Sequence, residues 1–324
     1  MNSSTSKSSL DNNTILTFLS FYCSQGIVQV CGNLVLILVV FTTKELREKE
    51  FIFPGGLAVA DALSGCGQLG LSIDRLLMTM KLQFGELVPA IQCRFKFHKV
   101  AIEWSGYASS AMVLFISVDR FFACHSISAY GKLSRKYALS GLLGAYIFAT
   151  LNVVLNTVSV ATNKPMMVSS ACFGAPGMPS WAKKIQFFYR ILVSYGSVII
   201  YMLALASLKI NEKKYQHNAI LKVKLGRQRK VTKALLHVST CTFCFNSVPI
   251  TLFFILDMIR IKAADRIFFA SILFLVMNLN ALYNVFLYYF KTDEVRKAVK
   301  KLLCPCRKTN TVTSVSCVVR HNYI

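Results

Sequence analysis

Acidic, basic and amide side chains interrupt several long apolar segments of this sequence. Asn33 stands in the first of these segments and Asp61 in the second. Asp119 and Arg120 are neighbours in a third. An ionised side chain in hydrocarbon is costly unless it is paired, hydrated or protonated, so such residues usually serve structure or function. The chemistry open to them is charge pairing, hydrogen bonding, cation binding or proton movement.

The sequence offers little sign of the motifs that mark soluble enzymes. The sequence contains no Walker motif, no H-E-x-x-H and no G-x-S-x-G pattern. Residues 65–70 do match G-x-G-x-x-G, but they lie inside a hydrophobic segment. A dinucleotide fingerprint needs a preceding strand in a βαβ unit, so these glycines instead favour close helix packing or a bend. The sequence therefore predicts that the protein is not an enzyme.

The composition places the chain in the membrane class. Of the 324 residues, 54% are hydrophobic and 16% are charged, and the mean hydropathy is +0.50. Four uncharged segments are each long enough to cross about 30 Å of hydrocarbon as a helix: 15–43, 138–162, 238–256 and 267–290. Three more apolar segments carry a few charges, at 52–77, 98–124 and 186–208. Because backbone groups in lipid must be satisfied within their own segment, these patterns predict an all-α membrane protein with a seven-transmembrane helix bundle.

The loops between these segments carry unequal numbers of basic residues. If the N-terminus is outside, Lys and Arg number 23 on the cytoplasmic side and 10 on the outer side. That bias favours an N-terminus outside and a C-terminus in the cytoplasm, in a multi-pass protein of the plasma membrane. Glycosylation sequons at Asn2 and Asn12 agree with this orientation. We attribute the net charge of +23 to a basic surface facing anionic lipid and acidic partners, and we expect no nucleic acid as a partner.

Four regions follow from this arrangement. They are an extracellular N-terminus at 1–14, a seven-transmembrane domain at 15–290, a short amphipathic eighth helix at 291–303 and a cytoplasmic tail at 304–324. Apolar residues fall on one side of the amphipathic segment, namely Val295, Val299, Leu302 and Leu303. We expect that helix to lie in the membrane interface. Cys304 and Cys306 follow it and are candidates for palmitoylation, the alternative being free cytosolic thiols.

Short motifs in the apolar segments occur in a characteristic order. They are Gly32-Asn33-Leu34-Val35, Leu57-Ala58-Val59-Ala60-Asp61, Ser117-Val118-Asp119-Arg120-Phe121, Phe243 with Pro249, and Asn280-Ala281-Leu282-Tyr283-Asn284-Val285-Phe286-Leu287-Tyr288. Over about residues 20–305 this set resembles the rhodopsin-like (class A) G-protein-coupled receptors. The segments 118–122 and 134–137 are most similar to the nematode Srsx serpentine chemoreceptor family.

The sequence departs from the family pattern at three motifs. Asn284-Val285 stands where the family has Asn-Pro, and Phe121 stands where it has tyrosine. Asn246-Ser247-Val248-Pro249 replaces Cys-Trp-x-Pro, so the tryptophan is missing. These changes leave open a receptor-like protein that no longer signals.

The resemblance implies a polar cluster in the middle of the bundle. In it Asp61 faces Ser109, Asn280 and Asn284, with Asn33 nearby. In the family these oxygens can hold an allosteric sodium ion, and we expect no other cofactor. The alternative is a hydrated polar cluster that joins four helices.

The resemblance also assigns an activation site. Asp119 would hold Arg120 in the resting state, and the released arginine would engage the G protein, with Phe121 completing the motif; a simple interfacial role is the alternative for Arg120. Pro249 removes a backbone hydrogen bond and is expected to kink the sixth span, either as a hinge or as a static bend.

Two further expectations concern the partners of that arginine. Tyr201 and Tyr288 would approach Arg120 in an active state, or they are ordinary packing aromatics. Many relatives have a sixth-helix acid that locks the arginine. Counting back from Pro249, that place falls near Arg229, so an acidic lock is absent and elevated basal activity is expected.

At the outer end the resemblance implies a disulfide and a ligand pocket. Cys93 and Cys172 would form the disulfide, which an oxidising exterior favours. The candidate pocket residues are Ile102, Glu103, Tyr107, Phe254, Asp257, Phe274 and Asn278. Ile102 stands where aminergic receptors have an acid, which disfavours biogenic amines. Glu103 has an alternative interpretation as a structural carboxylate.

These features together predict a chemosensory G-protein-coupled receptor. Its partners would be an extracellular small-molecule or peptide ligand, a heterotrimeric G protein and membrane lipid. The alternative is a seven-helix transporter or channel that uses Asp61 and Arg120 on an ion or proton path. Transporters usually show inverted repeats and broken helices in matching positions, and this sequence shows neither.

Overall fold

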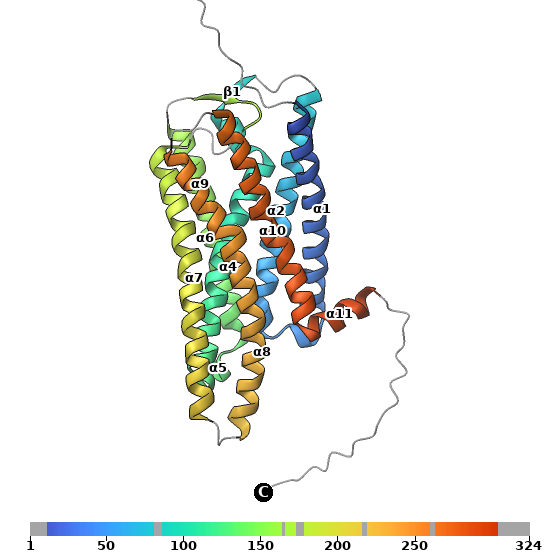
Figure 1. The fold of residues 1–324 in the computed structure, drawn as a ribbon, viewed down its shortest axis with the longest axis vertical. Helices are drawn as coiled ribbons and strands as arrows, with labels where there is room; N and C mark the ends of the chain where they lie inside the picture. Colours follow the sequence, from blue (N-terminus) through green and yellow to red (C-terminus); the bar gives the residue numbers. More distant parts are fainter. Residues whose placement is uncertain are drawn as a thin grey trace, which may run out of the picture.

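The computed structural model describes residues 12–80, 86–163, 166–172, 178–215, 219–259 and 263–303. Almost all of these residues are helical (Figure 1). The elements are α1 (Asn12–Thr42), η1 (Lys44–Leu46), α2 (Lys49–Met80), β1 (Leu87–Pro89), α3 (Ala90–Phe95), α4 (Phe97–His125), α5 (Ile127–Lys132), α6 (Arg135–Thr162), β2 (Met167–Ser169), α7 (Ser180–Lys214), α8 (Ala219–Thr242), η2 (Phe243–Ser247), α9 (Val248–Met258), α10 (Ala263–Lys291) and α11 (Asp293–Leu303).

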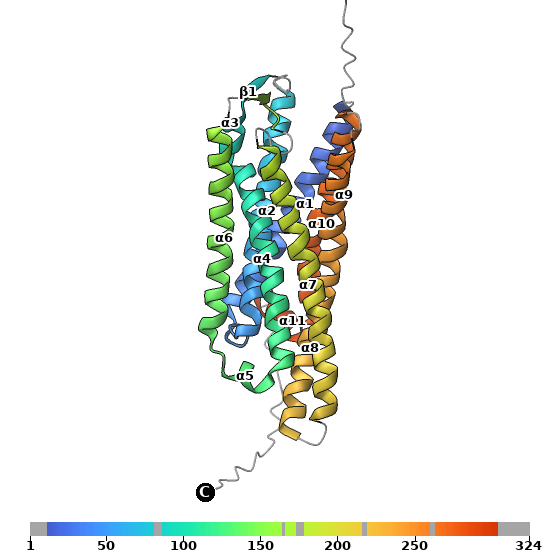
Figure 2. The same ribbon diagram turned by 90° about the vertical axis from the view of Figure 1, so that its left-hand side faces the viewer.

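Seven helical stretches within the described residues are long and apolar enough to cross a membrane. They are α1, α2, α4, α6, α7, the continuous run α8–η2–α9, and α10. Figures 1 and 2 show them running side by side along the long axis of the molecule, with α11 turned away from that axis. The predicted seven-helix bundle with a short additional helix is therefore confirmed.

The two ends of the bundle differ in structure. At one end β1 and β2 pair antiparallel, with Leu87 opposite Ser169. Beside them Cys93 of α3 forms a disulfide with Cys172, so we call this the disulfide end. The opposite end carries α5 and α11 (Figure 1), and we call it the Arg120 end because α4 brings Arg120 there. Helix α1 begins at the disulfide end, and α11 lies at the other.

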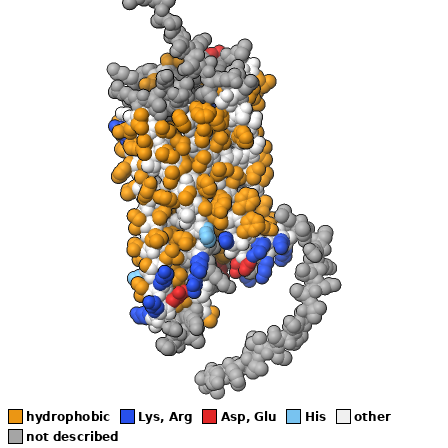
Figure 3. Space-filling model, in the orientation of Figure 1, with side chains coloured by type: hydrophobic (Ala, Val, Ile, Leu, Met, Phe, Trp, Pro, Cys, Tyr) orange, Lys and Arg blue, Asp and Glu red, His pale blue; other side chains and the backbone are white. Residues whose placement is uncertain are grey.

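The outer surface of the bundle is apolar and part of its interior is polar. Leu155 of α6 is 63% exposed and Phe188 of α7 is 67% exposed, whereas Asn33, Asp61 and Arg120 are buried. Figure 3 shows apolar side chains covering the middle of the visible face, with Lys and Arg side chains gathered toward the Arg120 end. This arrangement suits a lipid solvent, because hydrocarbon accepts apolar side chains and penalises exposed charge.

Glycines let α2 approach its neighbours closely. A Cβ added at Gly65 would lie 2.9 Å from a methyl of Val30 and 3.2 Å from the carbonyl oxygen of Gly26, both on α1. A Cβ at Gly67 would lie 2.8 Å from Ile102 on α4. Small residues at such positions allow van der Waals packing between membrane helices. The G-x-G-x-x-G match therefore reflects helix packing, as predicted.

Several helices extend beyond the expected ranges, and α2, for example, spans Lys49–Met80 instead of 52–77. Helix α1 begins at Asn12, and α11 begins at Asp293 because Lys291 still belongs to α10. Acidic residues in the first turn of α11 favour a helix start there, since the helix dipole is positive at its N-terminus. Val295 and Val299 are buried against the bundle, whereas Leu302 is 43% exposed.

Several predicted residues lie outside the described part of the chain. They are Asn2, Cys304, Cys306 and the tail that follows, together with the side chains of Asn12, Asp257 and Leu303. Their predicted roles stay predictions.

Candidate functional site

A cavity of about 820 Å³ lies between the helices on the side of the disulfide end. Its wall includes Cys93 and Val168 near that end, and it extends inward to Asp61 on α2. Most of the lining residues come from α2, α4, α7, α9 and α10, which are far apart in the sequence. A cavity of this size falls within the range that small-molecule ligands occupy in proteins.

Four of the predicted pocket residues line this cavity, namely Ile102, Glu103, Phe274 and Asn278. Tyr107 does not. It is buried between α4, α6 and α7, where its hydroxyl accepts a hydrogen bond of 2.9 Å from Asn156 and its ring centroid lies 5.8 Å from that of Tyr189. The helical phase of α4 turns Tyr107 away from the cavity and presents Gly106 to it.

On α9 the cavity is lined by Phe253, whereas the predicted Phe254 is not among its lining residues. Both rings pack against Phe187 of α7, at centroid distances of 5.5 and 5.9 Å. One residue corresponds to a rotation of about 100° on a helix, so a small error in the helical phase exchanges neighbouring side chains.

Glu103 lines the cavity and is also paired within the protein. Its carboxylate forms a salt bridge with Arg94 of α3 and accepts a hydrogen bond of 2.6 Å from Asn156 of α6. These contacts tie α3, α4 and α6 together, which supports the structural interpretation of this carboxylate.

Five basic residues in the cavity wall were not predicted to take part in a pocket. They are Arg75, Arg94, Lys99, Lys183 and Arg190, against two acidic residues, Asp61 and Glu103. The sequence did offer a signal, because three of the five lie inside apolar spans, where a charge usually has a purpose.

Arg190 of α7 reaches the cavity across a glycine. Its guanidinium lies over the ring of Tyr107, 5.7 Å from the centroid, and a Cβ added at Gly106 would overlap its Nη2. The Nε of Arg190 is buried and makes no hydrogen bond with any described residue. The absence of a side chain at position 106 therefore makes room for this guanidinium.

The inner end of the cavity holds the predicted polar cluster. The Asp61 carboxylate accepts hydrogen bonds from Ser109 of α4 at 2.9 Å and from Asn284 of α10 at 3.1 Å. Asn280 lines the same cavity. Asn33 of α1 instead donates to the carbonyl of Gln29, at 2.9 Å, and makes no hydrogen bond to the carboxylate within the described residues.

Several buried oxygens around this cluster have no donor within the described residues. They are the side-chain amide oxygens of Asn33, Asn280 and Asn284. Together with the carboxylate and the Ser109 hydroxyl, they form a set of hard oxygen donors of the kind that a small monovalent or divalent cation prefers. Among the described residues, no group of three or more His, Cys, Asp or Glu side chains comes together as a metal site. The donor set fits sodium better than a transition metal.

The sixth span is irregular before Pro249. Phe243–Ser247 forms a π-helical turn, and Pro249 is the second residue of α9. Proline has no N–H to donate, and π-helical turns inside helices are local departures from the regular hydrogen-bond ladder. The irregular backbone lies where the sequence analysis expected a kink.

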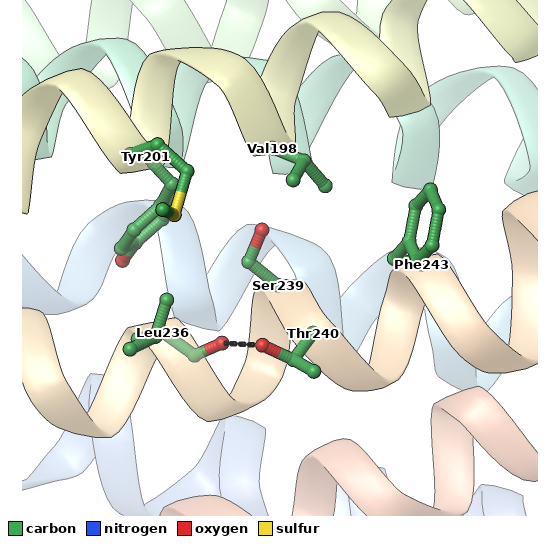
Figure 4. Close-up of a pocket in the computed structure, with 7 residues that line it drawn as sticks. Val198, Tyr201, Leu236, Ser239, Thr240 and Phe243 are labelled. Carbon is green, nitrogen blue, oxygen red and sulfur yellow. Dashed lines mark hydrogen bonds between the residues drawn. The ribbon is translucent and has the colours of Figure 1, made fainter.

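A second, smaller cavity of about 90 Å³ lies between α7 and α8, on the Arg120 side of this turn. Figure 4 shows its lining, with the Ser239 hydroxyl directed toward α7 and Thr240 bonded to the carbonyl of Leu236. The hydroxyls of Ser239 and Tyr201 are buried there without a hydrogen-bond partner in the described part of the chain.

At the Arg120 end a closed network surrounds Arg120, which is 0% exposed. Its guanidinium forms a salt bridge with Asp119 and donates to the hydroxyl of Tyr130 at 2.8 Å and to the side-chain oxygen of Gln228 at 3.2 Å. The Tyr130 hydroxyl in turn donates to Asp119 at 3.2 Å. Residues from α4, α5 and α8 therefore share one buried charge pair.

Gln228 links this network to a second acid. Its amide nitrogen donates to Glu50 of α2 at 2.9 Å, while its oxygen faces Arg120. The residue of α8 opposite Arg120 is thus Gln228 and not Arg229, which instead lies 3.5 Å from Glu212 of α7. The sequence analysis placed this position near Arg229, and the structure has Gln228, its neighbour and likewise non-acidic, opposite Arg120.

Tyr130, which bonds to Arg120 and Asp119, is also contacted by Lys49. Lys49 of α2 donates to the carbonyls of Tyr130 and Leu133, and its ammonium lies 4.1 Å from the centre of the Tyr130 ring. Burial raises the pKa of Tyr130, so its hydroxyl stays protonated and can donate to the Asp119 carboxylate.

The remaining predicted activation residues, Tyr201, Tyr288 and Phe121, lie outside this hydrogen-bond network. Tyr201 and Tyr288 are buried, and both hydroxyls lack a hydrogen-bond partner within the described residues. The ring of Phe121 is stacked on His125 at a centroid distance of 5.3 Å. The structure therefore brings Asp119 and Arg120 together with Tyr130 and Gln228, two residues that the sequence analysis did not name.

The chain matches the family model described as "7 transmembrane receptor (rhodopsin family)" over residues 32–288. It therefore belongs to the rhodopsin family of seven-transmembrane receptors, a family of signalling receptors and not of enzymes. Membership also supports a multi-pass protein of the plasma membrane that has an extracellular ligand and a G protein as partners.

Similar curated proteins carry receptor names. The chain is 22% identical over 299 residues to "G-protein coupled receptor 6" of Homo sapiens, which covers 88% of this chain and 74% of that protein. It is 21% identical over 295 residues to "G-protein coupled receptor 12" of Rattus norvegicus, covering 88% and 80% respectively.

Proposed function

We propose that this receptor binds its ligand in the 820 Å³ cavity and activates a heterotrimeric G protein at the Arg120 end. In this proposal the disulfide end faces the exterior and the Arg120 end faces the cytoplasm. Two features support it: the basic residues gather at the Arg120 end, and disulfides persist in oxidising surroundings.

The observation that carries the proposal is the closed network around Arg120. A guanidinium that is fully buried and bonded by Asp119, Tyr130 and Gln228 is unavailable to a partner protein. A ligand that binds a second helix arrangement more tightly shifts the population toward it, and that arrangement must break these bonds. The π-helical turn and Pro249 give the sixth span a place to bend.

The test is guanine-nucleotide exchange on a purified G protein by the full chain in lipid nanodiscs. Arg120→Ala is expected to reduce basal and evoked exchange by about tenfold or more, because the group that engages the G protein is gone. Arg229→Ala, which removes an exposed neighbouring charge, is the matched control and should retain exchange. Equal exchange by the Arg120→Ala and Arg229→Ala variants would contradict the proposal.

Sealed proteoliposomes, which enclose a compartment across which ion flux can be followed, distinguish the receptor from its rival. A transporter or channel that uses Asp61 and Arg120 would pass ions across a bilayer without a G protein. Ligand-free ion flux that is lost in Asp61→Asn, together with no nucleotide exchange, would favour that rival over the receptor.

We further propose sodium as an allosteric ligand of the polar cluster. Asp61, Ser109, Asn280 and Asn284 would hold the ion, and its charge would compensate the buried carboxylate. Sodium, but not the larger choline ion, is then expected to raise the thermal unfolding midpoint of the full chain. Asp61→Asn should remove that dependence. If the variant keeps the sodium effect, the cluster is a hydrated structural one.

A chemosensory role of the nematode Srsx type is the finer form of the proposal. It rests on the similarity of the segments 118–122 and 134–137 to that family. Localisation of the protein in sensory endings, with glycans at Asn2 and Asn12 removable from intact cells and palmitate on Cys304 and Cys306, would support both the role and the orientation. A cytoplasmic N-terminus would contradict the orientation.

A further inference from the structure

The charge of the large cavity points to the chemistry of its ligand. Five lining residues are basic and two are acidic. Both acids are engaged within the protein, since Glu103 pairs with Arg94 and Asp61 accepts bonds from Ser109 and Asn284. Lys183 and Arg190 also line the cavity, and neither forms a salt bridge with an acid among the described residues.

This charge lies in a mostly apolar surrounding. The wall includes aromatic and aliphatic side chains, among them Leu71, Met178, Phe187, Phe253, Phe274 and Met277. Like charges held in such a low-dielectric region repel each other more strongly than in water. An anion that enters the cavity relieves this repulsion, while its apolar part fits the remaining wall.

Arg190 provides a specific group for that anion. Its guanidinium extends from α7 over the ring of Tyr107, and Gly106 leaves the space that it occupies. Its Nε is a buried donor without a hydrogen-bond partner among the described residues. Guanidinium donors match the oxygens of a carboxylate or a phosphate in a planar, two-bond geometry.

Lys183 stands on the same helix as Arg190 and lines the same cavity. The two positions are seven residues apart, which is about two helical turns, so they lie on one face of α7. Lys184, the next residue, is exposed and is not part of the lining. Helix α7 therefore presents a pair of cations to the cavity.

We propose that the ligand of this cavity is an amphipathic organic anion, a carboxylate or phosphate monoester on an apolar body, bound through Arg190 and Lys183. This inference rests on the proposed function, since it names the ligand class of the same cavity. It also agrees with the absence of an acid at position 102, because a cationic amine would find no free carboxylate at Ile102.

The experiment is direct binding to the purified full chain in nanodiscs of neutral phospholipid. Four compounds share a chain of ten carbon atoms and differ in the head group: decanoate, decyl phosphate, decanol and decylamine. Acetate and inorganic phosphate provide the head groups alone. The readout is the concentration dependence of the thermal unfolding midpoint.

We expect decanoate or decyl phosphate to bind saturably, and the alcohol, the amine and the two short anions to bind at least about tenfold more weakly. The proposal is overturned if neither decyl anion binds, or if decanol or decylamine binds as tightly as the anions. Equal binding of acetate or inorganic phosphate would overturn the amphipathic part and leave a simple anion site.

Two variants and a matched control locate the site. Arg190→Gln and Lys183→Gln are each expected to weaken binding of the decyl anion by about tenfold, while Lys184→Gln leaves it unchanged. Gly106→Ala should act like Arg190→Gln, because the added methyl displaces the guanidinium. Unliganded unfolding midpoints report whether each variant is folded. Unchanged binding in the folded Arg190→Gln and Lys183→Gln variants would refute the assignment.

Binding and signalling can fail separately. The binding readout needs no G protein, so anion binding without nucleotide exchange would contradict the proposed function and leave the ligand class intact. Nucleotide exchange that depends on Arg120, without binding of decanoate or decyl phosphate, would support the proposed function and contradict the ligand class.

Discussion

Arg190 and Arg120 place two guanidinium groups at opposite ends of the bundle in different surroundings. Arg120 is fully buried and has an acid, a phenol and an amide as partners. Arg190 lies against an aromatic ring at the edge of a large cavity, and its Nε has no hydrogen-bond partner among the described residues.

The difference shows what each end is built to do. A buried charge whose partners all come from the protein stabilises one arrangement of the helices that supply them, because removing a partner leaves an uncompensated charge. A cationic cavity with an unsatisfied donor is suited to a partner from outside. The Arg120 end therefore holds the protein in one state, while the cavity is the place where a ligand changes that state.

The largest effect is expected from removing the acid at the Arg120 end. Asp119→Asn leaves the Arg120 charge buried without its carboxylate, which destabilises this arrangement by about 4 kcal/mol. Basal nucleotide exchange should rise and the unfolding midpoint should fall. Arg190→Gln, the matching change in the large cavity, should shift the thermal unfolding midpoint of the unliganded protein much less. Equal shifts in the two variants would remove the distinction between the ends.

Removing the disulfide should lower the stability of the disulfide end. The bond joins residues 79 positions apart, so the paired Cys93→Ser and Cys172→Ser change is expected to lower stability by about 3 kcal/mol. Thermal unfolding with and without reductant measures this effect, and Cys66→Ser serves as the control. A receptor whose unfolding midpoint ignores both reductant and the double substitution would contradict the structural role of the bond.

A smaller effect is expected from Tyr130→Phe. The change removes the hydroxyl that accepts from Arg120 and donates to Asp119, and hydrogen bonds to charged groups contribute about 2 kcal/mol. Basal nucleotide exchange should increase by about thirtyfold. Tyr137→Phe, on the neighbouring helix α6, is a suitable control because its hydroxyl is not part of the network. A Tyr130→Phe protein with the same basal exchange as the parent would show that the phenol does not hold the network closed.

The smallest effect separates two adjacent residues of α8. Gln228→Ala removes one bond to Arg120 and one to Glu50, while Asp119 and Tyr130 keep the guanidinium bonded, so basal exchange should rise by only about fivefold. Arg229→Ala should leave it unchanged, because Arg229 contacts Glu212 instead. The reverse ranking would restore Arg229 as the residue facing Arg120.

Much of this architecture could be predicted from the sequence. The uncharged segments gave the helices, because hydrocarbon leaves the backbone few alternatives. The partners Ser109 and Asn284 of Asp61 followed from the family pattern, and the structure brings these side chains together. Local chemistry and motif order are sufficient for such features.

The rest depends on how each helix is rotated and on which distant side chains converge. Gln228 and Phe253 were missed by one residue each, since counting along the chain does not fix the helical phase to within 100°. Arg190 and Lys183 were visible as charges, but their shared cavity exists only in the packed bundle. Tyr130 lies on a short helix outside the spans, where no motif marked it.

The network around Arg120 is proposed to hold α4 and α8 together, and Cys124 reports on that contact directly. Its thiol is buried on α4, 3.4 Å from the hydroxyl of Thr232 on α8. The measurement is the alkylation rate of Cys124 by iodoacetamide, quantified by mass spectrometry in the parent, Gln228→Ala and Arg229→Ala proteins. If the network holds these helices together, alkylation is slow in the parent and in Arg229→Ala and faster in Gln228→Ala, with Cys66 unchanged throughout. An equal rate at Cys124 in all three proteins would contradict that role of the network.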